Sequence, residues 1–205
     1  MIETSVVRAE VLEVKEAGKV TRITVRYPFR PEPGNFVSLV NPGQWEFPLA
    51  VGDYWMGRME LYVSSKRLSQ WMKGREAVLL KGPLGTRLPA MREVLAFSTS
   101  VHLYDLLYPL REVVRGGGKA RLVCEDCDTE FVDEVDRPEG VLVSVPPDKL
   151  MRMEVPFPAY VYVRWANMNC MLGVCGTCVV GGRLACTSGP FLKVESVESL
   201  REMLP

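Results

Sequence analysis

The sequence contains very little histidine and few amide side chains. Among 205 residues there is one histidine, His102, with two glutamines and four asparagines. A Rieske centre needs two histidines, and c-type haem attachment needs a histidine directly after a Cys-x-x-Cys run, so both are excluded. Depletion of amides is one mark of thermophile proteins, although drift in composition produces the same shortage.

The sequence also lacks a net charge and a long apolar run. Lys plus Arg and Asp plus Glu number 25 each, so charge gives no attraction to nucleic acid or to an anionic membrane. No run of about 18 apolar residues is present, which predicts no membrane span. The first residues show no basic stretch followed by an apolar core, as a signal peptide would. We therefore expect a cytoplasmic protein with no nucleic-acid partner.

Four of the six cysteines lie close together near the C-terminus, in the order Cys170-x4-Cys175-x2-Cys178-x7-Cys186. This is the cysteine order of a plant-type [2Fe-2S] site. A disulfide framework is typical of small secreted domains, and a structural zinc site normally uses two Cys-x-x-Cys-like pairs, which the x4 spacing does not provide. We favour the iron–sulfur interpretation, with zinc and unliganded thiols as the alternatives.

The residues between these cysteines support that interpretation. Gly173 and Gly176 permit positive φ and a close approach of backbone N–H groups, which stabilise charge on cluster sulfurs. Gly181-Gly182 lies between two short apolar runs and predicts a two-residue hairpin turn. In that register Cys186 comes within one residue of Cys178 across the hairpin. The predicted cross-strand pairs are Val180 with Arg183, Val179 with Leu184, and Cys178 with Ala185.

The two remaining cysteines form a separate Cys124-x-x-Cys127 pair. The preceding run, ARLVCED, reads as a strand, so the pair is expected at a strand end, as small buried or disulfide-linked residues. A redox or metal role would need further ligands or partners, and the sequence contains no second half for such a site. Its role is left open.

The strand and helix patterns divide the chain into three parts. Up to about residue 90, short β-rich runs punctuated by Gly and Pro predict a small antiparallel barrel or sandwich, with a short helix near residues 66–74. Beyond Met91, strand and helix alternate, which indicates a small parallel α/β layer. Its clear helix is expected over residues 103–118, with a glycine stop. The final residues predict a strand and a short helix.

This order of parts, together with the segment MNCMLGVCGTCVVGGRLACTSGPF, resembles the electron transfer subunit of dihydroorotate dehydrogenase B, a member of the ferredoxin reductase-like flavoprotein superfamily. The runs PGNFVSLV, FPLAV and KGPLG resemble the motifs PGQFV, RP-[LIMF]-S-[IV] and GPLG of that family. The resemblance covers about the whole chain. The matching residues of the cluster segment are Cys170, Gly173, Cys175, Gly176, Cys178, Cys186, Gly189 and Pro190.

The resemblance implies an α/β plus β protein of ferredoxin reductase-like fold. Residues 1–88 would form an FAD-binding-type β-barrel, residues 89–164 a degenerate, reduced Rossmann-like nucleotide-binding layer, and residues 165–205 a [2Fe-2S] segment and tail. The chain would carry FAD and one [2Fe-2S] cluster. It would take electrons from the FMN of a partner dihydroorotate dehydrogenase catalytic subunit, in pyrimidine biosynthesis, and pass them to a downstream acceptor. The implied iron ligands are Cys170, Cys175, Cys178 and Cys186.

The chain departs from the family at the flavin strand. Phe47 stands where the family has an arginine that meets the flavin phosphates, and Ala50 stands where a serine contacts the flavin ring. Backbone groups of this strand could still hold the ring. A glycine-threonine turn of the family is replaced by YVSSKRLS. The hydroxyl and ammonium groups of this run could donate hydrogen bonds to a phosphate, or the run could be a solvated turn. The candidate FAD residues are Phe47, Pro48, Leu49, Ala50, Val51, Tyr62, Val63, Ser64, Ser65 and Lys66.

A second departure concerns the nicotinamide dinucleotide. The NAD-linked family has a glycine-rich loop after the first strand of the α/β layer, where glycine lets the backbone approach the dinucleotide. Here FSTSVHLYDLLYPL brings in the side chains of Val101, Leu103 and Tyr104, and Gly116–Gly118 follow a helix instead. We therefore predict no direct use of NAD(P). The alternatives are the flavin/iron–sulfur subunit of a sulfide dehydrogenase or ferredoxin–NADP reductase-like enzyme, and a zinc-stabilised, non-catalytic assembly protein.

Overall fold

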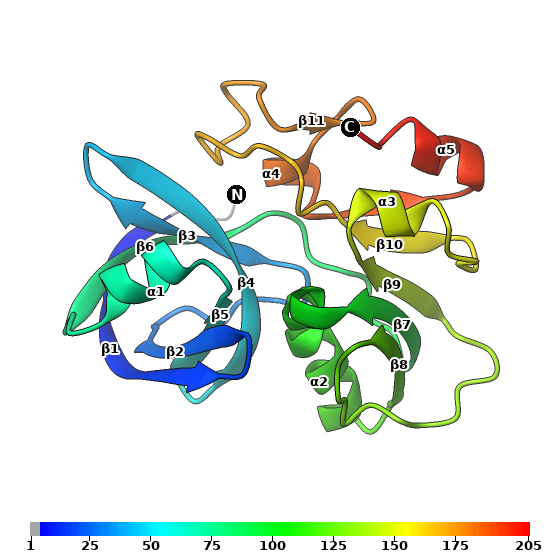
Figure 1. Cartoon of the computed structure of the whole chain (residues 1–205), viewed down its shortest axis with the longest axis horizontal. Helices are drawn as coiled ribbons and strands as arrows, with labels where there is room; N and C mark the ends of the chain where they lie inside the picture. The colour runs from blue at the N-terminus through cyan, green and yellow to red at the C-terminus, as the bar shows by residue number, and fades with distance from the viewer. Residues whose placement is uncertain (1–4) are drawn as a thin grey trace.

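The computed structural model describes residues 5–205. A β-barrel lies on one side of the molecule and a five-stranded sheet on the other, and the C-terminal loops lie above the junction between them (Figure 1). The barrel is closed in the order β1-β2-β5-β4-β3-β6, with antiparallel pairing throughout. Its strands are β1 Ser5–Ala17, β2 Val20–Arg26, β3 Phe36–Asn41, β4 Trp45–Trp55, β5 Arg58–Val63 and β6 Ala77–Leu84, and the short helix α1, Lys66–Met72, connects β5 to β6.

Alternation of apolar and polar residues fills the barrel. In β2, VTRITVR, Thr21, Ile23 and Val25 are buried while Arg22, Thr24 and Arg26 are partly or fully exposed, as the two-residue period of a strand requires. Gly52 is needed in β4, because a Cβ there would lie 2.3 Å from the ring of Tyr62. The register of β4 against β5 shifts at this point, and such bulges bend a strand so that a barrel can close.

The second sheet has the order β13-β10-β9-β7-β8, in which β13 is antiparallel to β10 and the other neighbours are parallel. Its strands are β7 Glu93–Thr99, β8 Lys119–Glu125, β9 Gly140–Ser144, β10 Ala159–Tyr162 and β13 Phe191–Val194. The helices of this part are the 3-10 helix η1 Ser100–Asp105, α2 Leu107–Arg115, α3 Pro147–Leu150, α4 Ala185–Ser188 and α5 Val197–Arg201. The predicted N-terminal antiparallel barrel and α/β layer are thus confirmed. None of the helices in residues 5–205 has the length and apolarity that a bilayer span requires.

The helix expected over residues 103–118 was placed too early. Residues Ser100–Asp105 form η1, and α2 begins only at Leu107. Pro109 explains the difference, because a proline inside an α-helix clashes with the carbonyl four residues earlier, here Asp105, and is tolerated in the first turn. The expected glycine stop is confirmed at Gly116, the C-cap of α2.

Two kinds of contact join the barrel to the sheet. Arg111 and Arg115 of α2 form ion pairs with Asp53 of β4, and the Tyr108 hydroxyl donates to the Pro31 carbonyl at 2.6 Å. The C-terminal segment contributes to the sheet, since β13 forms its edge next to β10.

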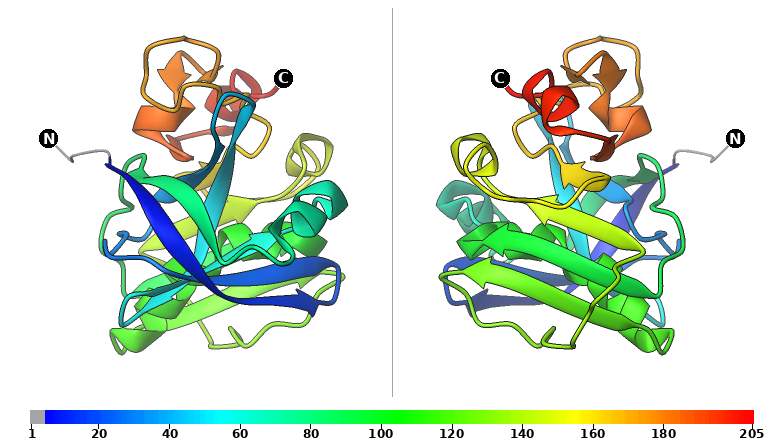
Figure 2. Two further views of the ribbon diagram at one scale, coloured as in Figure 1. Left: turned by 90° about the vertical axis from the view of Figure 1, so that its left-hand side faces the viewer. Right: turned by 90° about the vertical axis from the view of Figure 1, so that its right-hand side faces the viewer.

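In the side views the loops before α4 and the helix α5 lie together at one end of the molecule (Figure 2). The three domain boundaries remain predictions.

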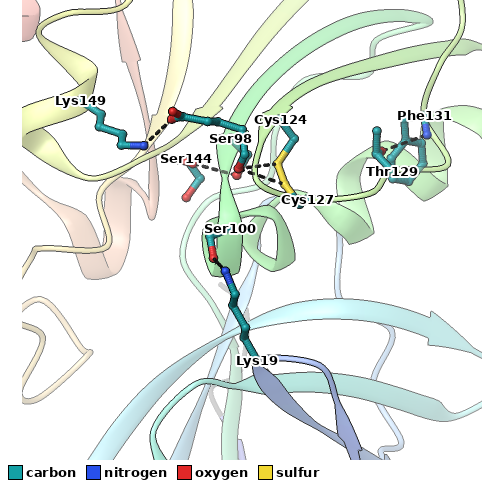
Figure 3. The surroundings of a disulfide bond; sticks show 10 residues. Lys19, Ser98, Ser100, Cys124, Cys127, Thr129, Phe131, Ser144 and Lys149 are labelled. Atoms are coloured by element: carbon teal, nitrogen blue, oxygen red, sulfur yellow. Dashed lines mark hydrogen bonds and ion pairs between the residues drawn. A yellow bond between two sulfur atoms is a disulfide. The ribbon is translucent and has the colours of Figure 1, made fainter.

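Cys124 and Cys127 are linked by a disulfide at the end of β8 (Figure 3). Their Cα atoms are 5.8 Å apart, which lies in the usual range for a disulfide. Lys149 at the end of α3 pairs with Glu125, the residue that follows Cys124. Of the two forms expected at this strand end, the structure therefore has the disulfide.

Candidate functional site

A cavity of about 330 Å³ lies between the barrel and the C-terminal part of the chain. On the barrel side it is bounded by β4, the end of β5 and the residues that follow β5. Eight of the ten candidate FAD residues line it: Phe47, Pro48, Leu49, Ala50, Tyr62, Val63, Ser64 and Ser65. The segment Phe47–Ala50 of β4 and the turn after β5, which the sequence placed in one candidate site, therefore meet at one cavity.

The other two candidate residues lie elsewhere. Val51 is 2% exposed and packs in the barrel core. Lys66 lines a neighbouring depression of about 360 Å³, which shares Val63 and Ser64 with the cavity. The residues of β4 from Phe47 to Ala50 therefore line the cavity, whereas the side chain of Val51 points into the barrel core.

The opposite wall of the cavity was not predicted. It consists of Asp105 from the end of η1, residues that end or follow β10, and the segment that leads into the cysteine loop. Ligands of open α/β sheets bind outside the carboxyl ends of the strands, and Arg164 lies two residues beyond the end of such a strand, β10. That position was the signal in the sequence. The wall residues are Asp105, Tyr162, Val163, Arg164, Ala166, Asn167, Met168 and Asn169.

A polar network runs along this edge of the sheet. Asp105 is 6% exposed and accepts hydrogen bonds from Arg164 Nη1 at 2.9 and 3.0 Å and from Ser144 Oγ at 2.7 Å. Ser98 Oγ in turn donates to the Ser144 carbonyl at 2.9 Å. The charge of Asp105 raises the pKa of Arg164 above its usual value, against the opposing effect of burial. The guanidinium is therefore charged, and its partner is fixed by neighbouring strands.

Side chains also fill the region where a glycine-rich dinucleotide loop would lie. The 3-10 helix η1 follows β7 directly, and its Leu103 is buried. Tyr104 stacks on Tyr62 with ring centroids 4.4 Å apart and an interplanar angle of 23°. Glycines in such a loop let the backbone approach a dinucleotide closely, and this arrangement offers aromatic and aliphatic side chains instead.

The predicted hairpin of the cysteine loop is confirmed. Strands β11, Val179–Val180, and β12, Arg183–Leu184, pair in the expected register, and Ala185 N donates to the Cys178 carbonyl at 2.9 Å. Both turn glycines, Gly181-Gly182, have positive φ, 53° and 72°, as the favoured two-residue hairpin turn requires. The hairpin brings the Sγ atoms of Cys178 and Cys186 to 3.1 Å.

The first half of the loop wraps backbone N–H groups around a sulfur. Leu172 N and Cys175 N both donate to Cys170 Sγ at 3.4 Å. Gly173 and Gly176 have φ values of 77° and 73°, in agreement with the positive φ expected for them. This chain path directs two backbone donors at the Cys170 sulfur, as the sulfurs of a cluster need.

The thiols differ in their protonation. Hydrogen bonds from Thr177, and then from Cys170, lower the pKa of the exposed Cys175 thiol to about 6. Burial, followed by the hydrogen bond with Cys178, raises the pKa of the Cys186 thiol to about 11. The loop therefore has one thiol, Cys175, that is ionised at neutral pH and one, Cys186, that is protonated there.

The donor set fits an iron–sulfur cluster in its chemistry. All four cysteines of the loop are outside any disulfide, and they supply the thiolates that such a cluster uses. Over residues 5–205, no three His, Cys, Asp or Glu side chains converge closely enough to hold a single metal ion. The ligand set Cys170, Cys175, Cys178 and Cys186 remains a prediction.

A buried lysine that was not among the predicted site residues joins the cavity to the cysteine loop. Lys81 of β6 is 7% exposed. Its Nζ donates to the Cys170 carbonyl at 3.0 Å and forms an ion pair with Glu46, which lines the cavity. Lys81 begins the KGPLG run, whose resemblance to the family motif GPLG assigns no role to the lysine.

The same motif packs against the residues after Cys186. Thr86 N donates to the Gly189 carbonyl at 2.7 Å, and Thr86 Oγ1 donates to the Thr187 carbonyl at 2.7 Å. A Cβ on Gly85 would lie 2.2 Å from the Gly189 oxygen. Two segments that resembled the family separately in sequence are therefore in contact in the structure.

Comparison with known proteins gives one sequence relative and several structural ones. No family model matches the chain. A probable dihydroorotate dehydrogenase B (NAD(+)), electron transfer subunit, of Thermoplasma volcanium is 24% identical over 220 aligned positions, which cover 90% of this chain and 87% of that protein. The structure of an NADH-dependent reduced ferredoxin–NADP oxidoreductase matches all of this chain and 94% of its own, with a TM-score of 0.75 and 17% identity. Phthalate dioxygenase reductase matches 72% of this chain and 62% of its own, with a TM-score of 0.55 and 11% identity.

These similarities agree with the resemblance found in the sequence motifs. The structural relatives share the order of an antiparallel barrel followed by an α/β sheet at low sequence identity, which establishes the architecture. The sequence relative extends over nearly the whole chain. The chain therefore has the ferredoxin reductase-like fold and resembles in sequence an electron transfer subunit of dihydroorotate dehydrogenase B.

Proposed function

We propose that this protein is an electron transfer subunit that holds FAD in the cavity beside β4 and a [2Fe-2S] cluster on the cysteine loop. It relays electrons from the FMN of a dihydroorotate dehydrogenase-type catalytic subunit to a downstream acceptor. One observation carries the proposal. The cavity lined by the flavin strand is closed on its other side by Asn167, Met168 and Asn169, which run directly into Cys170.

The two groups supply complementary chemistry when bound, because flavin exchanges one or two electrons and the cluster exchanges one. The residues of the chain bind and orient them. The strand Phe47–Ala50 and Tyr62 offer a wall for the flavin ring, and Ser64 and Ser65 offer hydroxyls beside it. Met168 is 9% exposed and Cys178 and Cys186 are each 2% exposed, so this side of the cysteine loop excludes water, which tunes a cluster's potential.

We also propose that the protein does not react with NAD(P) directly, unlike its relative, whose name includes NAD(+). The support is the set of side chains on η1 and the Tyr62–Tyr104 stack at the edge of the sheet. Purified protein, and its complex with the catalytic subunit, should show no saturable oxidation of NADH or NADPH. Saturable oxidation of either would overturn this point.

The experiment that tests the relay compares different electron donors. Dihydroorotate with the catalytic subunit should reduce the protein's visible chromophores anaerobically, whereas sulfide or reduced ferredoxin should not. Reduction by sulfide or by ferredoxin in place of dihydroorotate would favour the sulfide dehydrogenase or ferredoxin–NADP reductase-like alternative. Stoichiometric zinc without iron would favour the non-catalytic assembly protein and contradict the proposal.

A further inference from the structure

The cavity has an unusual charge distribution for a flavin nucleotide site. Its strand has Phe47, 42% exposed, at the position where the resembling family has an arginine for the flavin phosphates. Among the cavity-lining residues that the structure describes, Arg164 is the single cationic side chain. Among the side chains that line the cavity, Arg164 alone can therefore neutralise the charge of a flavin phosphate bound here.

Arg164 lies across the cavity from the barrel and reaches it. It follows β10, and its Nη2 donates to Ser64 Oγ at 3.4 Å. Ser64 is exposed and belongs to the turn after β5, for which the sequence left open a contact with phosphate or a solvated turn. The two residues are 100 positions apart in the chain, so only the fold brings them together.

The guanidinium still has hydrogen-bonding capacity to spare. Both contacts with Asp105 use Nη1 alone, and Ser64 takes one hydrogen bond from Nη2. Within residues 5–205 the Nε atom has no partner in the described contacts. A guanidinium has five N–H donors in a fixed fork, so its Nε–Nη2 edge can still bind a phosphate in bidentate fashion.

Asp105 fixes this orientation in advance. Its carboxylate is 6% exposed, whereas the Arg164 side chain is 35% exposed. The arginine is therefore held from the buried side and open toward the cavity. Such preorganisation lowers the cost of ordering the side chain when a ligand binds.

We propose that Arg164, together with Ser64, is the phosphate anchor of this cavity and replaces the arginine that is missing at position 47. The cavity then selects flavins that carry a phosphate, FMN or FAD, over riboflavin. This inference rests on the proposed function and deepens it, because it assigns the recognition of the flavin to a residue outside the barrel.

The test is a titration of flavin-free protein with riboflavin, FMN and FAD, followed by the quenching of flavin fluorescence. The variants are Arg164→Met, Ser64→Ala and, as a matched control, Arg121→Met, an exposed arginine on β8 of the same sheet that lines none of the described cavities. Wild-type protein should bind FMN or FAD at least about tenfold more tightly than riboflavin. Arg164→Met should abolish that preference while leaving riboflavin binding unchanged, since charge-assisted contacts to phosphate are the strong ones. Arg121→Met should behave as wild type.

Riboflavin serves as the internal control for folding. If Arg164→Met leaves Asp105 unpaired and unfolds the protein, the double variant Asp105→Asn/Arg164→Met removes that charge and should show the same loss of preference. Loss for FMN and FAD alike would place the anchored phosphate next to the ribityl chain, and loss for FAD alone would place it on the adenosine side; both support the anchor. An Arg164→Met protein that keeps the wild-type preference would overturn it. Wild-type protein that binds none of the three flavins would instead overturn the flavin part of the proposed function.

Discussion

At the scale of single residues, the most informative position is Lys81, a charged side chain buried between β6 and the cysteine loop. Its Nζ satisfies the carbonyl of Cys170 and the carboxylate of Glu46 at once. Buried charges are kept only where partners compensate for lost hydration. The sequence could not reveal this role, because both partners come from distant parts of the chain.

Lys81→Met should therefore destabilise the protein by about 1–3 kcal/mol, since a partly buried carbonyl and a partly buried carboxylate lose their partner. The free energy of unfolding is measured by urea denaturation, and iron content is measured on the same preparations. The double variant Lys81→Met/Glu46→Gln should recover part of the loss. Wild-type stability in Lys81→Met would contradict the assignment.

A second residue-scale prediction concerns the pKa of Cys175. Because Thr177 hydrogen bonds lower that pKa to about 6, the thiolate is present at pH values above about 6 and is lost below. In metal-free protein, alkylation of Cys175 by iodoacetamide should reach half its maximal rate near pH 6, as followed by peptide mass spectrometry. Thr177→Val should move this midpoint upward. A Cys175 rate that still rises between pH 8 and 9 in the wild type would contradict the lowered pKa.

At the scale of elements, local patterns were predictable and long-range ones were not. The hairpin β11–β12 was predicted in its register because Gly181-Gly182 specifies the turn by itself. The start of α2 differs from the predicted one because proline is tolerated only in the first turn of a helix, and Pro109 therefore places that start at Leu107. The wall formed by Asp105 and Arg164 depends on the sheet order, which the sequence does not state.

The contact between Gly85, the last residue of KGPLG, and the segment after Cys186 yields a stability prediction. Gly85→Ala combines a φ of 78° with a clash against the Gly189 oxygen, whereas Gly43→Ala has a similar φ of 71° and open space around its Cβ. Left-handed strain alone costs about 1–2 kcal/mol, and the backbone clash adds about 1–3 kcal/mol. Urea denaturation should therefore find Gly85→Ala the less stable variant. Equal losses in the two variants would show that the packing of the two segments contributes nothing.

At the scale of the whole molecule, the fold places two candidate redox sites side by side. The barrel contributes one wall of the cavity, the α/β part contributes Asp105 of η1 and Arg164 after β10, and the C-terminal segment contributes both the remaining wall and the cysteine loop. The order of these three parts was predictable from strand and helix patterns. Their meeting at one cavity required the tertiary structure.

The central claim is that one chain holds a flavin and a [2Fe-2S] cluster together. The most direct measurement is the absorption spectrum of anaerobically purified protein before and after dithionite, with assays of iron and acid-extracted flavin on the same sample. The account predicts flavin bands, additional absorbance at longer wavelength that dithionite bleaches, and about two iron atoms and one flavin per chain. Zinc in place of iron, or a colourless protein with neither metal nor flavin, would contradict it.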